Sequence, residues 1–187
     1  MYSPRRLGPL GIIVVAALAI GACAPMTVNS ITARGADFKQ YRTFAWADDR
    51  LDTGDPRLDN NPFFLERLQS DVEKQLGAKG FEKTDHATAA LVIHYHASVT
   101  QRIDLSNMEE TAYTENQKYT NEDNGSGPFV YDEGSLVLDM IDARTEKLVW
   151  RGWAEGSMDG YIDNQSWMEL KIDDAVTRIL ARLPGRS

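Results

Sequence analysis

The chain has 187 residues, of which 42% are hydrophobic and 26% charged, so its length suits one ordinary globular domain with a short appendage. Lys and Arg total 20 and Asp and Glu total 28, which gives a formal net charge of -8. This excess of acid argues against electrostatic binding of nucleic acid or of anionic lipid. The single cysteine excludes a disulfide scaffold and a cysteine-based zinc site.

Residues 1–22 have the pattern of a bacterial signal peptide. Arg5 and Arg6 form a basic start, and an uncharged stretch from Leu7 to Ala24 follows them. Glycine and proline interrupt this stretch, which leaves its apolar part too short for a reliable transmembrane helix. We therefore interpret it as a signal peptide that is cleaved off.

The signal ends in Ile20-Gly21-Ala22-Cys23, where an aliphatic and two small residues precede the chain's only cysteine. This order resembles the lipobox of bacterial lipoproteins. It predicts that Cys23 carries diacylglycerol and an N-acyl chain, which together anchor a protein stably to a membrane, and that residues 23–27 form a tether. The next residues, Ala24 and Pro25, include no aspartate, which by resemblance to enterobacterial sorting favours the periplasmic face of the outer membrane over the inner membrane. The alternative is that Cys23 is a buried thiol in a short anchor helix.

The patterns after the tether predict a single domain over residues 28–187. Two short strands, at 26–33 and 42–46, precede a loop at 48–60 that is rich in Asp, Gly and Pro. Asn61-Pro62 is a typical helix start, and apolar residues then recur at three- and four-residue steps up to a stop at Gly80. These recurring residues are Leu65, Leu68, Val72 and Leu76.

Apolar and polar residues alternate from Leu91 to Val99, which predicts a strand with one buried face. Residues 101–132 lose this periodicity and hold seven acidic residues against two basic ones, so we expect a mobile acidic loop. Residues 133–143 and 147–158 then predict an antiparallel hairpin. A capping-box pattern at Ser166–Glu169 begins a second amphipathic helix.

The predicted order of elements is β-β-α-β-β-β-α. Two amphipathic helices need one common apolar surface, and a sheet can supply it. The expected fold is therefore α+β, with a mostly antiparallel sheet of four to five strands and both helices on one face.

Several short segments together resemble a known family. They are Asp37–Phe38, Tyr41–Trp46, Ala90–His94, Gly134–Asp139, Asp142–Thr145 and Leu148–Gly152. Combined with the lipobox, they are similar to the bacterial lipoprotein family of domain of unknown function 4136. The resemblance covers nearly the whole chain after Cys23 and implies an envelope lipoprotein of unassigned activity with a compact α+β domain. The acidic segment at 101–132 departs from the family's pattern.

Two histidines are the first candidates for chemistry. His94 and His96 are two residues apart on one strand, so their side chains share a face, and Asp139 and Arg151 are expected on the same face of neighbouring strands. The pattern favours a polar, solvated face on which Asp139 pairs with Arg151. A metal site of His94, His96 and Asp139 is the alternative. The third histidine, His86, is expected to be solvated in a turn.

Catalytic and calcium-binding motifs find little support. The aspartates of the loop at 48–60 fit no EF-hand spacing, so we expect a solvated acidic loop. The chain contains neither a G-x-S-x-G elbow nor a G-x-x-x-x-G-K phosphate loop, and a lipidated Cys23 cannot act as a nucleophile, so no enzymatic activity and no cofactor are predicted. The loop's aspartates are Asp48, Asp49, Asp52, Asp55 and Asp59.

Trp150 and Trp153 are three residues apart on one strand and therefore face opposite sides. Trp153 beside Arg151 on the outer face is a candidate contact for a protein or glycan partner, unless other parts of the chain shield both rings. Two function classes remain. One is a non-catalytic envelope lipoprotein that binds an envelope protein through this face; the other is a periplasmic domain that binds a metal or small ligand with His94 and His96.

Overall fold

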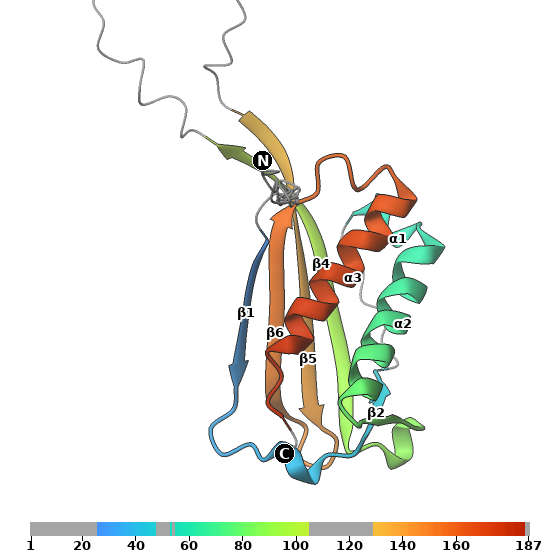
Figure 1. The fold of residues 1–187 in the computed structure, drawn as a ribbon, viewed down its shortest axis with the longest axis vertical. Helices are drawn as coiled ribbons and strands as arrows, with labels where there is room; N and C mark the ends of the chain where they lie inside the picture. The colour runs from blue at the N-terminus through green and yellow to red at the C-terminus, as the bar shows by residue number, and fades with distance from the viewer. Residues whose placement is uncertain (1–25, 48–52, 54, 105–128, 186–187) are drawn as a thin grey trace, which may run out of the picture.

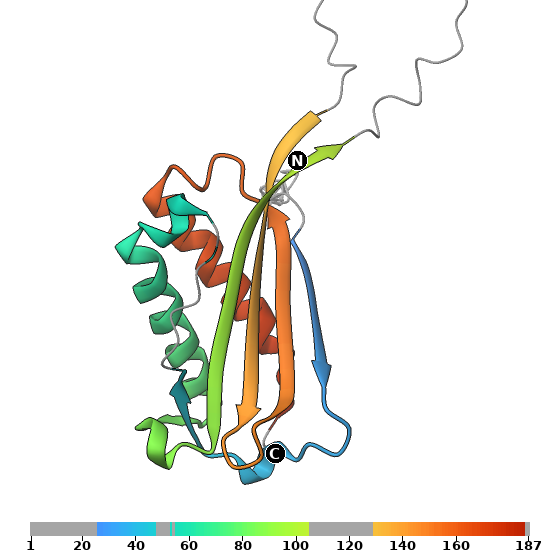
Figure 2. The ribbon, with the colours of Figure 1, turned by 180° about the vertical axis from the view of Figure 1, so that it is seen from behind.

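The computed structural model describes residues 26–47, 53, 55–104 and 129–185. Six strands form one sheet in these residues, and the helices pack against one of its faces (Figures 1 and 2). The strands are β1 (Thr27–Thr32), β2 (Thr43–Trp46), β3 (Glu82–Lys83), β4 (Leu91–Asp104), β5 (Phe129–Asp142) and β6 (Lys147–Ser157). The helices are α1 (Pro56–Asp59), α2 (Pro62–Ala78) and α3 (Gln165–Ala181), with short 3-10 turns at Phe38–Gln40 and His86–Thr88.

The strand order in the sheet is β1-β6-β5-β4-β2-β3. The strands β1, β6, β5 and β4 pair antiparallel, whereas β2 runs parallel to both β4 and β3. The α+β class is confirmed, but the expectation of a mostly antiparallel sheet of four to five strands needs correction, because the sheet has six strands and is mixed. The reason lies in α2, which carries the chain from the end of β2 back to the end where β2 began, and such a helical crossover makes the next strands parallel.

Two short elements escaped the sequence patterns. The strand β3 has two residues, and α1 has four, so neither is long enough to show a hydrophobic period. The helix α1 begins where the acidic loop was expected, with Asp55 as its N-cap and Pro56 as its first residue.

The hairpin strands β4 and β5 are longer than expected. They pair without a break from Leu91 opposite Asp142 to Asp104 opposite Phe129. The predicted loop at 101–132 is therefore wrong at both ends, because residues 101–104 and 129–132 are strand. The residues of these two strand ends are polar or exposed, so they show no alternation of apolar and polar residues. Backbone pairing between strands does not require such alternation. Arg102 also donates a 2.6 Å hydrogen bond to Glu133 across the two strands. Residues 105–128 lie outside the described residues, so their mobility stays a prediction.

Both long helices begin at asparagine caps. In α2, the Asn61 side chain accepts a hydrogen bond from the Phe63 backbone, and Pro62 occupies the first turn, as predicted. In α3, the cap is Asn164, which accepts from the Trp167 backbone at 3.1 Å, and not the predicted Ser166. No helix within the residues that the structure describes is long and apolar enough to cross a bilayer.

The core lies between the helices and the sheet. Its largest fully buried side chain is Trp150 of β6, which lies across Gly152 of the same strand. A Cβ atom at Gly152 would stand 2.3 Å from the Trp150 ring, so only glycine leaves room for the indole there. Other fully buried residues are Phe44, Leu68, Val72, Leu76, Leu91, Ile93, Leu138, Met140, Val176, Ile179 and Leu180. This packing closes the helix side of the sheet, while no described helix lies on the other side (Figure 2).

Candidate functional site

The side of the sheet opposite the helices is called the open face. Strand alternation brings one residue from each of four neighbouring strands into a single row across it. The register places His94 of β4 opposite Asp139 of β5, Asp139 opposite Arg151 of β6, and Arg151 opposite Ile31 of β1. The structure therefore brings together the predicted residues His94, Asp139 and Arg151.

Asp139 and Arg151 form the centre of this row. The Arg151 Nε and Nη2 atoms each donate a 2.6 Å hydrogen bond to a different carboxylate oxygen of Asp139. Only 4% of Asp139 is exposed. The hydrogen bond to Asp139 raises the pKa of Arg151 against the opposing effect of burial. The predicted pairing of these two residues is confirmed.

The histidines lie beside this ion pair. The His96 Nε2 atom is 3.6 Å from the Asp139 Oδ2 atom, and about half of the His96 side chain is exposed. Within the described ranges, no three His, Cys, Asp or Glu side chains are grouped so that they could hold a metal ion. Since both oxygens of Asp139 already accept hydrogen bonds from Arg151, the geometry favours an ion pair flanked by histidines over a metal centre. His86 is exposed in the turn before β4, as expected.

The two tryptophans of β6 lie on opposite faces, as predicted. Trp150 is fully buried under the helices, whereas Trp153 is partly exposed on the open face. Trp153 pairs across the sheet with Val137 on one side and Asn29 on the other. Together with Val137 and with Ile31, of which 53% is exposed, Trp153 places apolar surface beside the Arg151–Asp139 pair.

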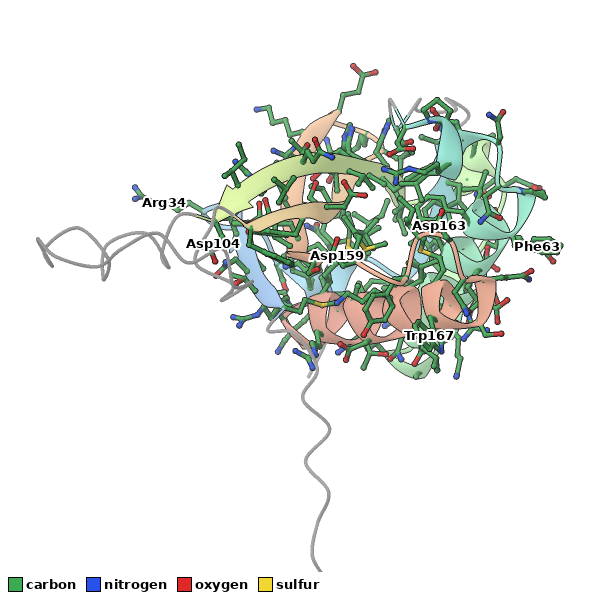
Figure 3. The ribbon with its side chains drawn as sticks, turned by 90° about the horizontal axis from the view of Figure 1, so that it is seen from above. Arg34, Phe63, Asp104, Asp159, Asp163 and Trp167 are labelled. Carbon is green, nitrogen blue, oxygen red and sulfur yellow. The ribbon has the colours of Figure 1, made fainter. Side chains whose placement is uncertain are left out.

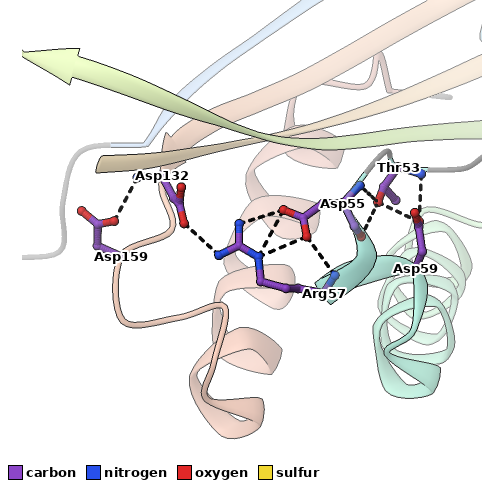
Figure 4. A network of polar contacts seen from close by, with 6 residues as sticks. All are labelled: Thr53, Asp55, Arg57, Asp59, Asp132 and Asp159. Atoms are coloured by element: carbon purple, nitrogen blue, oxygen red, sulfur yellow. Dashed lines mark hydrogen bonds and ion pairs between the residues drawn. The ribbon is translucent and has the colours of Figure 1, made fainter. Parts of the chain in front are cut away.

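The acidic loop contains a structural network rather than a solvated cluster (Figure 4). Asp55 is buried and accepts hydrogen bonds from the backbone and guanidinium of Arg57, which lower the pKa of Asp55 although burial raises it. Arg57 also donates to Asp132 of β5 at 3.0 Å, and Thr53 donates to Asp59 at 2.7 Å. The expectation of a solvated loop is thus wrong for Asp55, because Arg57 and the start of α1 satisfy its carboxylate. The predicted Asp48, Asp49 and Asp52 lie outside the described residues.

The sequence patterns missed several buried polar groups, among them Asp71 of α2. Tyr41 donates a 2.9 Å hydrogen bond to Asp142, which lies 101 positions away in the chain, and no local pattern indicates such a pair. Lys171 on α3 is another, with 7% of its surface exposed. The sequence did hold a signal for it, since Lys171 stands three residues after Met168 and one before Ile172, within the helix's apolar stripe.

Comparisons with known proteins agree on the fold. A family model described as "Domain of unknown function (DUF4136)" matches residues 28–185. A DUF4136 family protein from Bacteroides thetaiotaomicron has a similar structure, with a TM-score of 0.51 and 16% identity over 87% of this chain and 98% of that one. A PDZ domain protein from Parabacteroides distasonis has a TM-score of 0.50 and 16% identity over 86% of this chain and 35% of that one.

A third similar structure is a PelC dodecamer from Paraburkholderia phytofirmans, with a TM-score of 0.49 and 11% identity over 87% of this chain and 100% of that one. No curated protein sequence is significantly similar to the chain. The two structures with TM-scores of 0.51 and 0.50 show a shared fold, and at 16% identity they assign no activity to the chain.

Proposed function

The chain belongs to the family of domain of unknown function 4136 (DUF4136), and we propose that it is a non-catalytic lipoprotein of the bacterial envelope. In this proposal the open face of the sheet binds an envelope protein partner. The observation that carries it is that partly exposed apolar side chains surround a satisfied ion pair on a face that no described helix covers.

The anchor in this proposal is the lipid on Cys23. The strand β1 begins at Thr27, four positions later, and four extended residues span at most about 14 Å. The end of the sheet at which β1 starts is then held close to the bilayer surface. With two or more acyl chains the attachment is stable, and the sorting residues Ala24 and Pro25 support the periplasmic side of the outer membrane.

The chemistry of the open face favours a protein partner with an apolar patch. Tryptophan and arginine are the residues that contribute most often to the centre of protein interfaces, and here Trp153 and Arg151 are adjacent on one face. Because Asp139 already neutralises Arg151, a partner can cover this face without supplying a charge of its own. Ile31 extends the apolar surface onto the edge strand.

The alternative is a metal or small-ligand site at His94 and His96. It has less support, because Asp139, the carboxylate nearest to His96, has both oxygens bonded to Arg151. A divalent ion at this place would have to displace the guanidinium from a nearly buried carboxylate, which is unfavourable.

Site-specific photo-crosslinking in intact cells tests the proposed face. A photoreactive amino acid at Ile31 reports on the open face, and the same group at Leu170 on α3 is the matched control, because both positions are exposed, at 53% and 66%. We expect a discrete crosslinked protein from position 31 and none from position 170. Equal products from both positions, or a product from position 170 alone, would contradict the proposal.

A further inference from the structure

An apolar cavity lies on the helix side of the sheet, away from the proposed partner face. Its volume is about 60 Å³, and it is lined by the middle of β4 and β5, by the end of β6, by the first three turns of α3 and by residues of α1 and α2. Met26, Met158 and Met168 contribute flexible thioether side chains to its wall. A buried water needs roughly 10–15 Å³ on the same measure, so about four to six groups of that size fit.

One buried wall residue carries a charge. Lys171 is more than nine-tenths buried, and its neighbours in the wall include Ile172 and Ala175, whereas Glu155, the other charged residue of the lining, is exposed. The Lys171 ammonium lies 4.7 Å from the centre of the Tyr161 ring. Within the part of the chain that the structure describes, no carboxylate lies in ion-pair distance of it. A cation–π contact alone leaves most of the cost of burying an ammonium uncompensated.

Lys171 stands between the cavity and the molecular surface. It also borders an outer groove on α3, whose other lining residues are Tyr161, Trp167, Leu170 and the ion pair of Asp174 and Arg178. Trp167 projects from α3 toward the outside of the molecule, and 53% of it is exposed (Figure 3). Lys171 is therefore part of the lining of both the apolar cavity and the outer groove.

We propose that this cavity binds a medium-chain alkyl carboxylate, with its carboxylate on Lys171 and its alkyl tail among the methionines. Water does not fill an apolar cavity, and an alkyl chain that enters the cavity makes dispersion contacts with its wall. The ligand carboxylate would pair with the Lys171 ammonium, which has no carboxylate partner among the described residues. The volume limits the buried part of the tail to about six carbons, which is shorter than the chains of membrane lipids. This inference does not depend on the proposed function of the open face.

Calorimetric titration of the purified full chain tests the proposal, with octanoate as the probe and octanol as its neutral counterpart in the same detergent buffer. We expect octanoate to bind at least about tenfold more tightly, which corresponds to one charge-assisted hydrogen bond. Lys171→Met should remove this difference, because it keeps the length of the side chain and loses the charge. Lys79→Met, at an exposed lysine after α2, is the matched control and should keep it.

A second variant tests the cavity itself. Ala97→Leu adds a side chain at a wall position and should abolish binding of octanoate while the protein stays folded. It decides the matter if Lys171→Met fails to fold. Three results would overturn the proposal: no binding of octanoate, equal binding of octanoate and octanol, or an unchanged octanoate affinity in folded Lys171→Met or Ala97→Leu.

Discussion

Arg151 meets Asp139 side-on across two neighbouring strands, with two hydrogen bonds of 2.6 Å each. The carboxylate is nearly buried, whereas 42% of the arginine side chain is exposed. The pair therefore lies at the boundary between the sheet's interior and the open face. Its contribution to stability depends on keeping both members, because a lone carboxylate at this depth is costly.

Arg151→Met should destabilise the domain by about 1–3 kcal/mol, below the range for fully buried pairs because the guanidinium is partly solvated. The double variant Arg151→Met, Asp139→Leu should recover most of that loss, since no uncompensated charge remains. Urea unfolding of both variants measures the difference. A double variant less stable than Arg151→Met would refute this account of the pair.

Gly152→Ala should lower the free energy of unfolding by at least about 2 kcal/mol. The added methyl group would stand 2.3 Å from the Trp150 ring and 2.7 Å from Ile179, so the core must shift. Gly77→Ala is the matched control, because no atom outside the neighbouring backbone of α2 lies within 4 Å of its added Cβ, and it should stabilise α2 by about 0.5–1 kcal/mol. Equal unfolding midpoints for the two variants would show that β6 and α3 do not pack as described.

The Asp142 carboxyl should make the stability of the domain depend on pH. Burial raises the pKa of its carboxyl, but hydrogen bonds from Thr145, Tyr41 and Arg144 outweigh burial and hold it below the ordinary value of 3.8. A lowered folded-state pKa contributes stability above the unfolded-state pKa, and that contribution is lost as the pH falls through the folded-state value. Stability should therefore fall on acidification below about pH 4.

Tyr41→Phe removes one of the hydrogen bonds that lower the pKa of Asp142. The variant should be less stable at neutral pH by about 1 kcal/mol and should lose less stability between about pH 5 and pH 3 than the native chain. Denaturant unfolding at a series of pH values measures how the free energy of unfolding of each protein changes with pH. Parallel curves for the two proteins would show that Tyr41 does not influence this titration.

Cys23→Ser tests the proposed anchor. Without the thiol, no diacylglycerol can be attached, so the variant should remain unprocessed or be released from the membrane fraction. Mass spectrometry of the native protein should find acyl chains on residue 23. A native protein without lipid that fractionates as freely soluble would contradict the proposed localisation.

Local patterns in the sequence were sufficient to predict the long helices and strands and the faces on which their side chains lie. Asn61-Pro62 marks the start of α2, and Leu68 and Ile179 fall on apolar stripes that are fully buried in the structure. The alternation along β4 and β5 placed His94 and Asp139 on one face, and the register of the sheet confirms it. These features depend on neighbours within a few residues, where helical and strand periods act directly on side-chain direction.

The remaining features depend on contacts between distant segments. Only the assembled sheet decides that β2 runs parallel to β4, and only the meeting of α1 with β5 gives Arg57 its second partner, Asp132. Sequence alone determined which apolar residues of the long helices and strands face inward, because that is a property of the local backbone period. The tertiary structure decided which buried charges are paired, because pairing requires two chain segments to meet at hydrogen-bond distance. Asp139 pairs with Arg151, whereas Lys171 pairs with no carboxylate of the described residues.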